Sequence, residues 1–250
     1  MSGVFGNDGY LYQAVVVLNQ TLDWLLNKKL DFILIECETS SYSVDAVFVG
    51  TEENKPVADF KEIKGGMFDP AECIKNIEKC IGEFLHTDLP SPKEVGISII
   101  YKDNSQVTKK KKKLFSMFLT KFGGSLDLSS SKLPEFTGDE YEVMEKLVQL
   151  IDKAIPKFND EYLKKVIYLK MRHYFEIRIQ AAADRERQGA SGNKFLKINV
   201  KDLLLDGGLS EVLIRERNDL FGKREDVIEL LLGNKEGENE INIETITGEG

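Results

Sequence analysis

The apolar residues change their spacing several times along the first part of the chain, and this limits the possible folds more than any other feature. Residues 10–28 carry apolar side chains at three- and four-residue steps, which is typical of a helix with one core-facing side. Four strands are predicted, at residues 30–38, 44–50, 56–64 and 94–101. A second helix is predicted from Asp69 to about Leu85, between the third strand and the fourth. This order predicts an α/β fold in which helices pack against a mixed sheet.

The composition agrees with a globular chain. Of 250 residues, 42% are apolar and 30% are charged, which excludes collagen-like, wholly disordered and membrane-spanning classes. The sequence does not open with a secretory signal, so we expect a cytoplasmic protein. The three cysteines, Cys37, Cys73 and Cys80, show no CxxC spacing, and there are only two histidines. A disulfide framework and a zinc site are therefore not predicted.

The second half of the sequence is predicted to be mainly helical. Helical patterns cover residues 138–155, 160–188 and 202–232, the last in two pieces, while residues 126–137 read as a Ser-rich loop and 195–200 as a short strand. We therefore expect a sheet-containing domain at residues 1–125, a helical region for oligomerisation or partner docking at 135–233, and an acidic disordered tail at 234–250. The net charge is -8, and the five glutamates and one lysine after Asn234 contribute half of it, so the overall charge says little about partners.

Three charged residues are predicted to meet on one hairpin. If residues 51–55 form its turn, Asp45 on one strand pairs with about Glu62 on the next. Side chains alternate along a strand, so Glu62 and Lys64 lie on the same face while Ile63 lies on the other. Two carboxylates of this kind suit a hard divalent cation such as Mg²⁺, and the adjacent ammonium suits a phosphate. Asp59 has the opposite parity and is not assigned to the site.

This arrangement resembles the PD-(D/E)xK nuclease superfamily, with Asp45 and the segment Glu62-Ile63-Lys64 at the motif positions and Val44 in place of the proline. The segment Gly9-Tyr10-Leu11-Tyr12-Gln13, followed by Ile35-Glu36 at a strand end, is similar to the N-terminal endonuclease domain of CD-NTase-associated antiphage effectors. The resemblance covers roughly residues 8–102. It implies a restriction-endonuclease-like αβββαβ core in which Gln13 and Glu36 join the site. Glu38 shares the parity of Glu36 and is the alternative to it.

The resemblance implies a metal-dependent endonuclease that hydrolyses DNA and acts in bacterial antiphage defence. Asp45 and Glu62 would hold Mg²⁺ or Mn²⁺, and Lys64 would assist at the scissile phosphate. The sequence contains no GxxxxGK[ST] pattern, so a partner ATPase of the SMC-like or HerA type, or a sensor subunit, is expected, together with homo-oligomerisation. One alternative is a non-catalytic adaptor that uses the fold as a scaffold, and another is a nuclease that acts on RNA.

Two basic segments are further candidates for contact with nucleic acid. One is a run of five lysines, Lys109, Lys110, Lys111, Lys112 and Lys113, for which the alternative is a solvated helix start. The other is the helix at residues 160–188, where Lys and Arg residues alternate with aromatic ones. The alternative for these aromatic residues is a core or a subunit contact.

Overall fold

A computed structural model describes most of the chain. The described residues are 7–38, 43–65, 68–84, 94–102, 130–132, 135–136, 140–187, 195–216 and 223–232. Within them, the first half consists of α1 (Asn7–Asn27), a set of strands, and α2 (Pro70–Phe84) between the third strand and the fourth. The strands are β1 (Lys29–Glu38), β2 (Ser43–Glu52), β3 (Lys55–Lys64), β4 (Glu94–Lys102), β5 (Ser130–Lys132), β6 (Glu135–Phe136) and β7 (Leu196–Asn199).

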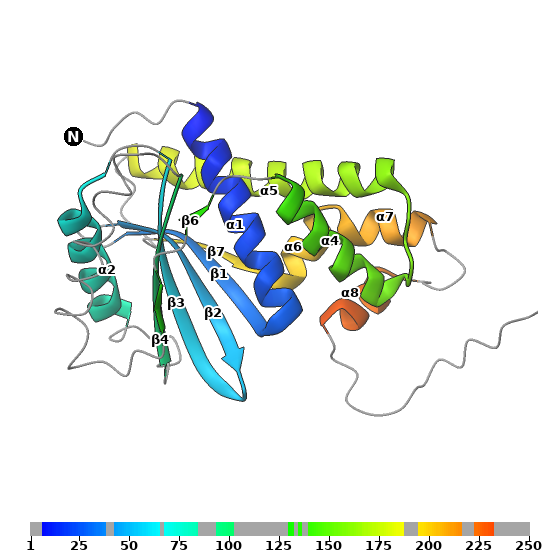
Figure 1. Cartoon of the computed structure of the whole chain (residues 1–250), viewed down its shortest axis with the longest axis horizontal. Coiled ribbons are helices and arrows are strands. Elements are labelled where there is room, and N and C mark those ends of the chain that lie inside the picture. The colour runs from blue at the N-terminus through cyan, green and yellow to red at the C-terminus, as the bar shows by residue number, and fades with distance from the viewer. Residues whose placement is uncertain are drawn as a thin grey trace, which may run out of the picture.

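The predicted α/β class and the αβββαβ order of the first half are both confirmed. The strands join in the order β5-β4-β3-β2-β1-β7, with β6 also beside β4. β1, β2 and β3 pair in antiparallel fashion, whereas β3 and β4 are parallel because α2 connects them. Figure 1 shows α1 crossing one face of this sheet and α2 lying on the other side.

Each face of the sheet has its own apolar core. On the α1 face, Ile33, Phe48 and Ile63 pack with residues of α1. On the α2 face, Phe60 and Ile97 pack with Ile74, Ile77 and other residues of α2. Successive strand residues alternate between these two cores, so neighbouring polar residues within β2 or β3 also lie on opposite faces of the sheet.

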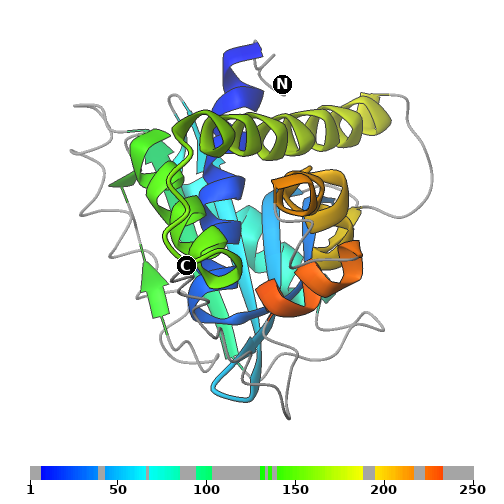
Figure 2. The same ribbon diagram turned by 90° about the vertical axis from the view of Figure 1, so that its right-hand side faces the viewer.

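The second half of the chain is mainly helical, as predicted. Its helices are α4 (Glu140–Ala154), α5 (Glu161–Arg187), α6 (Val200–Asp206), α7 (Leu209–Glu216) and α8 (Arg224–Leu232). α4 and α5 pack on α1, and their buried residues belong to the same core as the α1 face of the sheet. Figure 2 shows this group of helices beside α1, with α5 crossing it. The predicted domain boundary near residues 125–135 falls largely outside the described residues.

Two predictions for this half are wrong in detail. Residues 126–137 are predicted to form only a loop, but Ser130–Lys132 and Glu135–Phe136 are short strands that pair in parallel with β4. The Ser-rich sequence does not indicate this pairing, because the backbone forms it. The helical stretch expected from 202 to 232 in two pieces, with breaks at Gly207-Gly208 and Gly222, contains three helices, so the number of pieces is wrong while the break at Gly207-Gly208 is confirmed. Gly208, after the C-cap residue Gly207, has a positive φ of 80°, which ends α6 before α7 begins at Leu209.

Candidate active site

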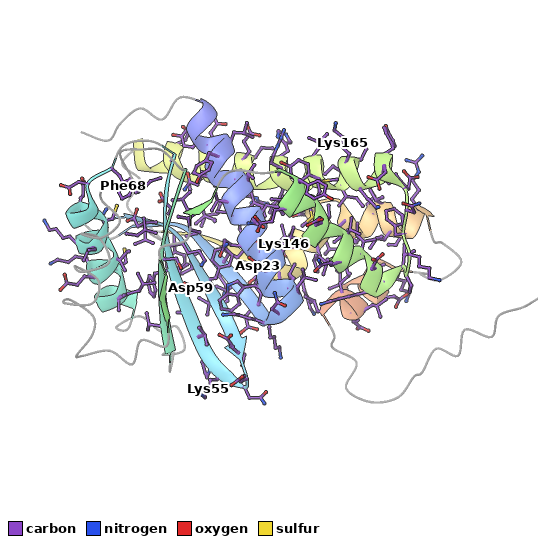
Figure 3. The ribbon with its side chains drawn as sticks, viewed as in Figure 1. Asp23, Lys55, Asp59, Phe68, Lys146 and Lys165 are labelled. Atoms are coloured by element: carbon purple, nitrogen blue, oxygen red, sulfur yellow. The ribbon has the colours of Figure 1, made fainter. Side chains whose placement is uncertain are left out.

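A tight turn sets the register of the β2–β3 hairpin. Glu53 and Asn54 have φ values of 48° and 63°, so both occupy the left-handed region that a two-residue hairpin turn of type I′ requires. The pairs run from Glu52 with Lys55 to Ala46 with Lys61, and Asp45 and Glu62 are the next residues on the two strands beyond the last pair. In Figure 3, Lys55 marks the turn end of this hairpin, and Asp45 and Glu62 therefore lie toward the other end.

The structure brings Asp45, Glu62 and Lys64 together on the α2 side of the sheet. The Nζ atom of Lys64 lies 3.2 Å from Oδ2 of Asp45 and also forms an ion pair with Oε2 of Glu62. Oδ2 of Asp45 accepts a further hydrogen bond from the backbone N–H of Ile63, at 2.5 Å. The lysine therefore bridges the two acids through one oxygen of each. The convergence expected from the hairpin register is confirmed, while the roles of these residues stay predictions.

The other carboxylate oxygens of the two acids are less engaged. Glu62 is 1% exposed, and among the described residues its Oε1 atom has no hydrogen-bond partner. Oδ1 of Asp45 accepts a long contact of 3.4 Å from Nε2 of Gln13. A buried carboxylate oxygen without a donor is costly, so Oε1 of Glu62 is an atom beside which a cation would be favoured.

Gln13 reaches the site from a different element. It lies near the start of α1 and is 8% exposed, and its contact with Asp45 is the placement that the resemblance implied. Glu36 lies on β1 between Ile35, which pairs with Ala46, and Cys37, which pairs with Val44. Its backbone is therefore opposite Asp45, and its side chain lies outside the described part of the structure.

The pKa values of Glu62 and Lys64 are both raised, for different reasons. Burial raises the pKa of Glu62 to about 8, with Lys64 lowering it and Asp45 adding to the rise. For Lys64, burial acts to lower the pKa, but attraction to Asp45 and Glu62 outweighs burial and holds the pKa well above its usual value. Lys64 is therefore cationic at neutral pH, and the proton on Glu62 is the one that a bound cation would displace.

A second polar cluster lies on the other face of β3. The ammonium group of Lys61 is 2.7 Å from Oδ2 of Asp59 and 3.5 Å from Oγ of Ser98 on β4. Lys61 is 3% exposed and its Nζ atom lies 5.6 Å from the ring centroid of Phe48. Asp59, labelled in Figure 3, is thus directed away from Asp45 and Glu62, as its parity predicted.

Sequence reasoning assigned no role to two close neighbours of the site. A Cβ atom added to Gly65, just after Lys64, would lie 3.2 Å from the ring of Tyr12, which is tighter than an ordinary contact, so glycine favours the close approach of α1 to this strand end. Cys73 on α2 is 3% exposed and lies within electrostatic range of Glu62 and Lys64. Burial raises the pKa of its thiol, so Cys73 borders the site as an uncharged side chain. The Gly-Gly pair that follows Lys64 was the sequence feature from which the contact between Gly65 and Tyr12 could have been predicted.

The remaining candidates give a mixed result. The lysine run at 109–113 lies outside the described residues. On α5, Tyr168 and Phe175 are buried, as the core alternative predicted, whereas Tyr162 is 75% exposed. Among the described residues, no group of three or more His, Cys, Asp or Glu side chains is placed to hold a metal ion. The described helices include none that is both long and apolar enough to cross a membrane.

Comparisons with known proteins add structural neighbours only. No family model matches the sequence, and no curated protein matches it. Solved structures of the Acinetobacter baumannii Cap4 SAVED/CARF-domain containing receptor are similar. The complex with the cyclic trinucleotide 3'3'3'-cAAA gives a TM-score of 0.47 and 15% identity over 85% of this chain and 49% of that chain. The structure named without a ligand gives a TM-score of 0.47 and 14% identity, over 85% of this chain and 48% of that chain. The chain spans about half the length of these receptors.

Proposed function

We propose that this protein is a metal-dependent endonuclease that hydrolyses phosphodiester bonds in DNA. The observation that carries the proposal is the cluster in which Lys64 bridges Asp45 and Glu62 while Oε1 of Glu62 is buried without a partner among the described residues. Two acids and one amine at the end of a hairpin form a minimal phosphoryl-transfer site, because the carboxylates can bind a cation while the ammonium group contacts a phosphate. The assignment to antiphage defence is supported by the motif resemblance.

The donor atoms fit Mg²⁺ or Mn²⁺. Both candidate ligands, Asp45 and Glu62, offer carboxylate oxygens, which hard cations prefer. Mg²⁺ is commonly held by one or two carboxylates, with waters and substrate phosphate oxygens completing the shell, so the absence of a third acidic ligand among the described residues is compatible with it. A bound cation of this kind would polarise the phosphodiester and lower the pKa of the attacking water.

The chain's own residues would orient the reacting groups. The Ile63 N–H donates to one oxygen of Asp45 and the Gln13 amide contacts the other, so both contacts would help to keep the orientation of the carboxylate. Lys64 lies beside both acids and is 19% exposed at its side chain, so its ammonium can contact a phosphate oxygen and offset the charge that builds during attack.

Several further proposals concern partners. DNA is the proposed substrate, and the lysines at 109–113 are proposed to contact its backbone. Cleavage of both strands of a duplex favours two copies of the site, which supports a homo-oligomer. A partner ATPase or a sensor subunit is proposed as the source of activation. A cytoplasmic location follows from this role.

The test is a plasmid cleavage assay with Mg²⁺ or Mn²⁺. Wild-type protein is expected to nick or linearise the plasmid, and Asp45→Ala, Glu62→Gln and Lys64→Ala are each expected to reduce the rate by roughly 100-fold or more. Glu52→Gln is the matched control. It makes the same chemical change on the same hairpin, in a partly buried pair with Lys28 near the turn end of the hairpin.

Circular dichroism should show that all variants remain folded. Cleavage that persists in Asp45→Ala, or that is lost equally in Glu52→Gln, would contradict the proposal. The assay is repeated with an RNA substrate and with the products of neighbouring genes. No cleavage under any of these conditions would favour the adaptor alternative.

A further inference from the structure

The outer side of α5 carries exposed apolar side chains. Tyr162 is 75% exposed, Ile177 is 51% exposed and Leu169 is 39% exposed. Three of the four large apolar side chains that are exposed in the described part of the chain therefore lie on this one helix. The opposite side of α5 packs into the core shared with α1, through the fully buried residues Ile167, Met171, Phe175 and Ile179. Within the described residues, α5 is apolar on two sides and only one of them is covered.

These exposed residues belong to a stripe that runs along most of the helix. Its members follow one another at steps of three or four residues and are Tyr162, Val166, Leu169, His173, Ile177 and Gln180. Steps of this size keep side chains on one face of a helix, where a second helix can pack against them. In Figures 1 and 2, α5 lies along one edge of the molecule, with α4, α6 and α7 on the same side of it. An exposed stripe with this many apolar members marks an interaction surface.

A second copy of α5 can pack on this stripe with the two helices antiparallel. When the two-fold axis passes beside His173, each residue is level with the residue of the second copy that lies equally far from His173 in the other direction. Leu169 is then level with Ile177 of the second copy, and Ile177 with its Leu169, so two apolar layers flank the axis. Further out, Tyr162 is level with Asp184 of the second copy, where its hydroxyl group can donate to the carboxylate.

The charged residues beside the stripe also suit this arrangement. At about 100° per residue, Lys165, Arg172 and Glu176 lie on the same side of the stripe. Antiparallel copies related by a two-fold axis bring that side of one helix next to the same side of the other, so Glu176 of each copy lies between Lys165 and Arg172 of the second. Figure 3 labels Lys165 on the outer edge of α5. Lys170, on the other side of the stripe, is 3.2 Å from Glu211 of its own chain, so its charge already has a partner.

We propose that two copies of this protein pair through the outer side of α5, with the helices antiparallel and His173 at the two-fold axis. The same surface then serves both copies, as in the commonest closed dimers. Its apolar layers and its charges match themselves, which favours a second copy of the chain over an unrelated partner. α5 lies outside residues 8–102, where the sequence resembles the nuclease superfamily. The pairing specifies the homo-oligomer that the proposed function calls for, and in that respect rests on it, but it can be tested without cleavage.

The first measurement is the mass of the full chain in solution, by sedimentation velocity over a series of protein concentrations. The wild-type protein is expected to sediment as a dimer. Ile177→Glu places a charge in both apolar layers and is expected to raise the dissociation constant of the dimer about tenfold or more. Tyr141→Glu is the matched control, because it replaces another exposed apolar side chain, 68% exposed on α4, and should keep the wild-type dissociation constant. Thermal melts by circular dichroism verify that each variant is folded.

The second measurement is disulfide cross-linking, which tests the register. A cysteine at the axis meets its own copy, so His173→Cys is expected to give a linked dimer when copper–phenanthroline is added as the oxidant. In the antiparallel pair, the two copies of Tyr162 lie about 33 Å apart along the helices. This is far beyond the limit of about 7 Å between Cα atoms for a disulfide, so Tyr162→Cys should not link. The wild-type protein, treated in the same way, gives the background from the three natural cysteines.

The outcomes separate this pairing from the proposed function. A wild-type protein that stays monomeric at every concentration, or a dimer that Ile177→Glu does not weaken, would overturn the pairing through α5. Linking of Tyr162→Cys as fully as His173→Cys would show that the helices are not antiparallel about His173. A monomer that cleaves the plasmid removes the pairing and keeps the nuclease assignment. A dimer through α5 that cleaves under no condition keeps the pairing and removes the nuclease assignment.

Discussion

Glu62 illustrates how one buried residue can serve function at a cost to the folded state. Its carboxyl group is enclosed by the α2 core, and the resulting pKa of about 8 means that it holds a proton over much of the neutral range. A carboxylate must lose that proton before it binds a metal ion. The same burial that orients Glu62 therefore makes the proposed activity depend on pH.

We expect the rate of Mg²⁺-dependent cleavage to rise with pH up to about 8, the pKa of Glu62, and then to level off. Well below that pKa the ionised fraction changes about tenfold per pH unit, so the rate should follow it. Because the cation competes with the proton, a higher Mg²⁺ concentration should move the midpoint to lower pH. Initial rates across pH 6 to about 9 at two Mg²⁺ concentrations check this. A midpoint that ignores Mg²⁺ would exclude Glu62 as the titrating ligand.

At the scale of elements, the hairpin was the most predictable part of the site. Its register follows from a local turn and the two-residue period of a strand, and both are visible in the sequence between Asp45 and Lys64. Gln13 was different, because the way a helix docks on a sheet depends on packing that no local pattern encodes. The Lys61 contact with Ser98 was also not foreseen, since parallel pairing with β4 joins segments on either side of α2.

The turn gives a prediction about stability. Glu53 occupies the left-handed region, with φ 48°, at a position where Asn is favoured, and Gly is favoured at the next one. Glu53→Asn combined with Asn54→Gly is expected to stabilise the protein by about 1 kcal/mol, because a non-glycine residue in this region is strained. Thermal melts measure the gain. Glu53→Val should have the opposite effect, and equal melting temperatures for the two variants would contradict the argument.

Substitutions in the cluster of Lys61, Asp59 and Ser98 are expected to change the free energy of unfolding more than those in the turn. Lys61→Met leaves the Asp59 carboxylate, whose side chain is 16% exposed, without its counter-ion, and should cost roughly 3–5 kcal/mol. Adding Asp59→Leu removes the isolated charge and should recover most of that loss. Urea titrations of both variants test this. A double variant no more stable than Lys61→Met would mean that the pair itself, not the uncompensated charge, sustains the fold.

At the scale of the whole molecule, the helical region and the sheet share one core through α1. Phe175 on α5 is fully buried in the same cluster as Phe48 of β2. The sequence predicted helices after residue 138 but not that α4 and α5 pack on α1, because α1 is more than 100 residues away along the chain. A fragment that ends at residue 125 would leave the α4 and α5 side of α1 exposed to water.

This shared core predicts a single unfolding transition. Trp24, the only tryptophan, is 2% exposed and stacks on Phe48 with ring centroids 6.1 Å apart, so its fluorescence reports the contact between α1 and the sheet. Phe175→Ala removes a buried ring from α5 and should cost about 3–5 kcal/mol. The urea midpoints from Trp24 fluorescence and from circular dichroism should then fall together. If the dichroism midpoint falls while Trp24 fluorescence keeps its wild-type midpoint, α5 unfolds on its own and the two halves are separate cooperative units.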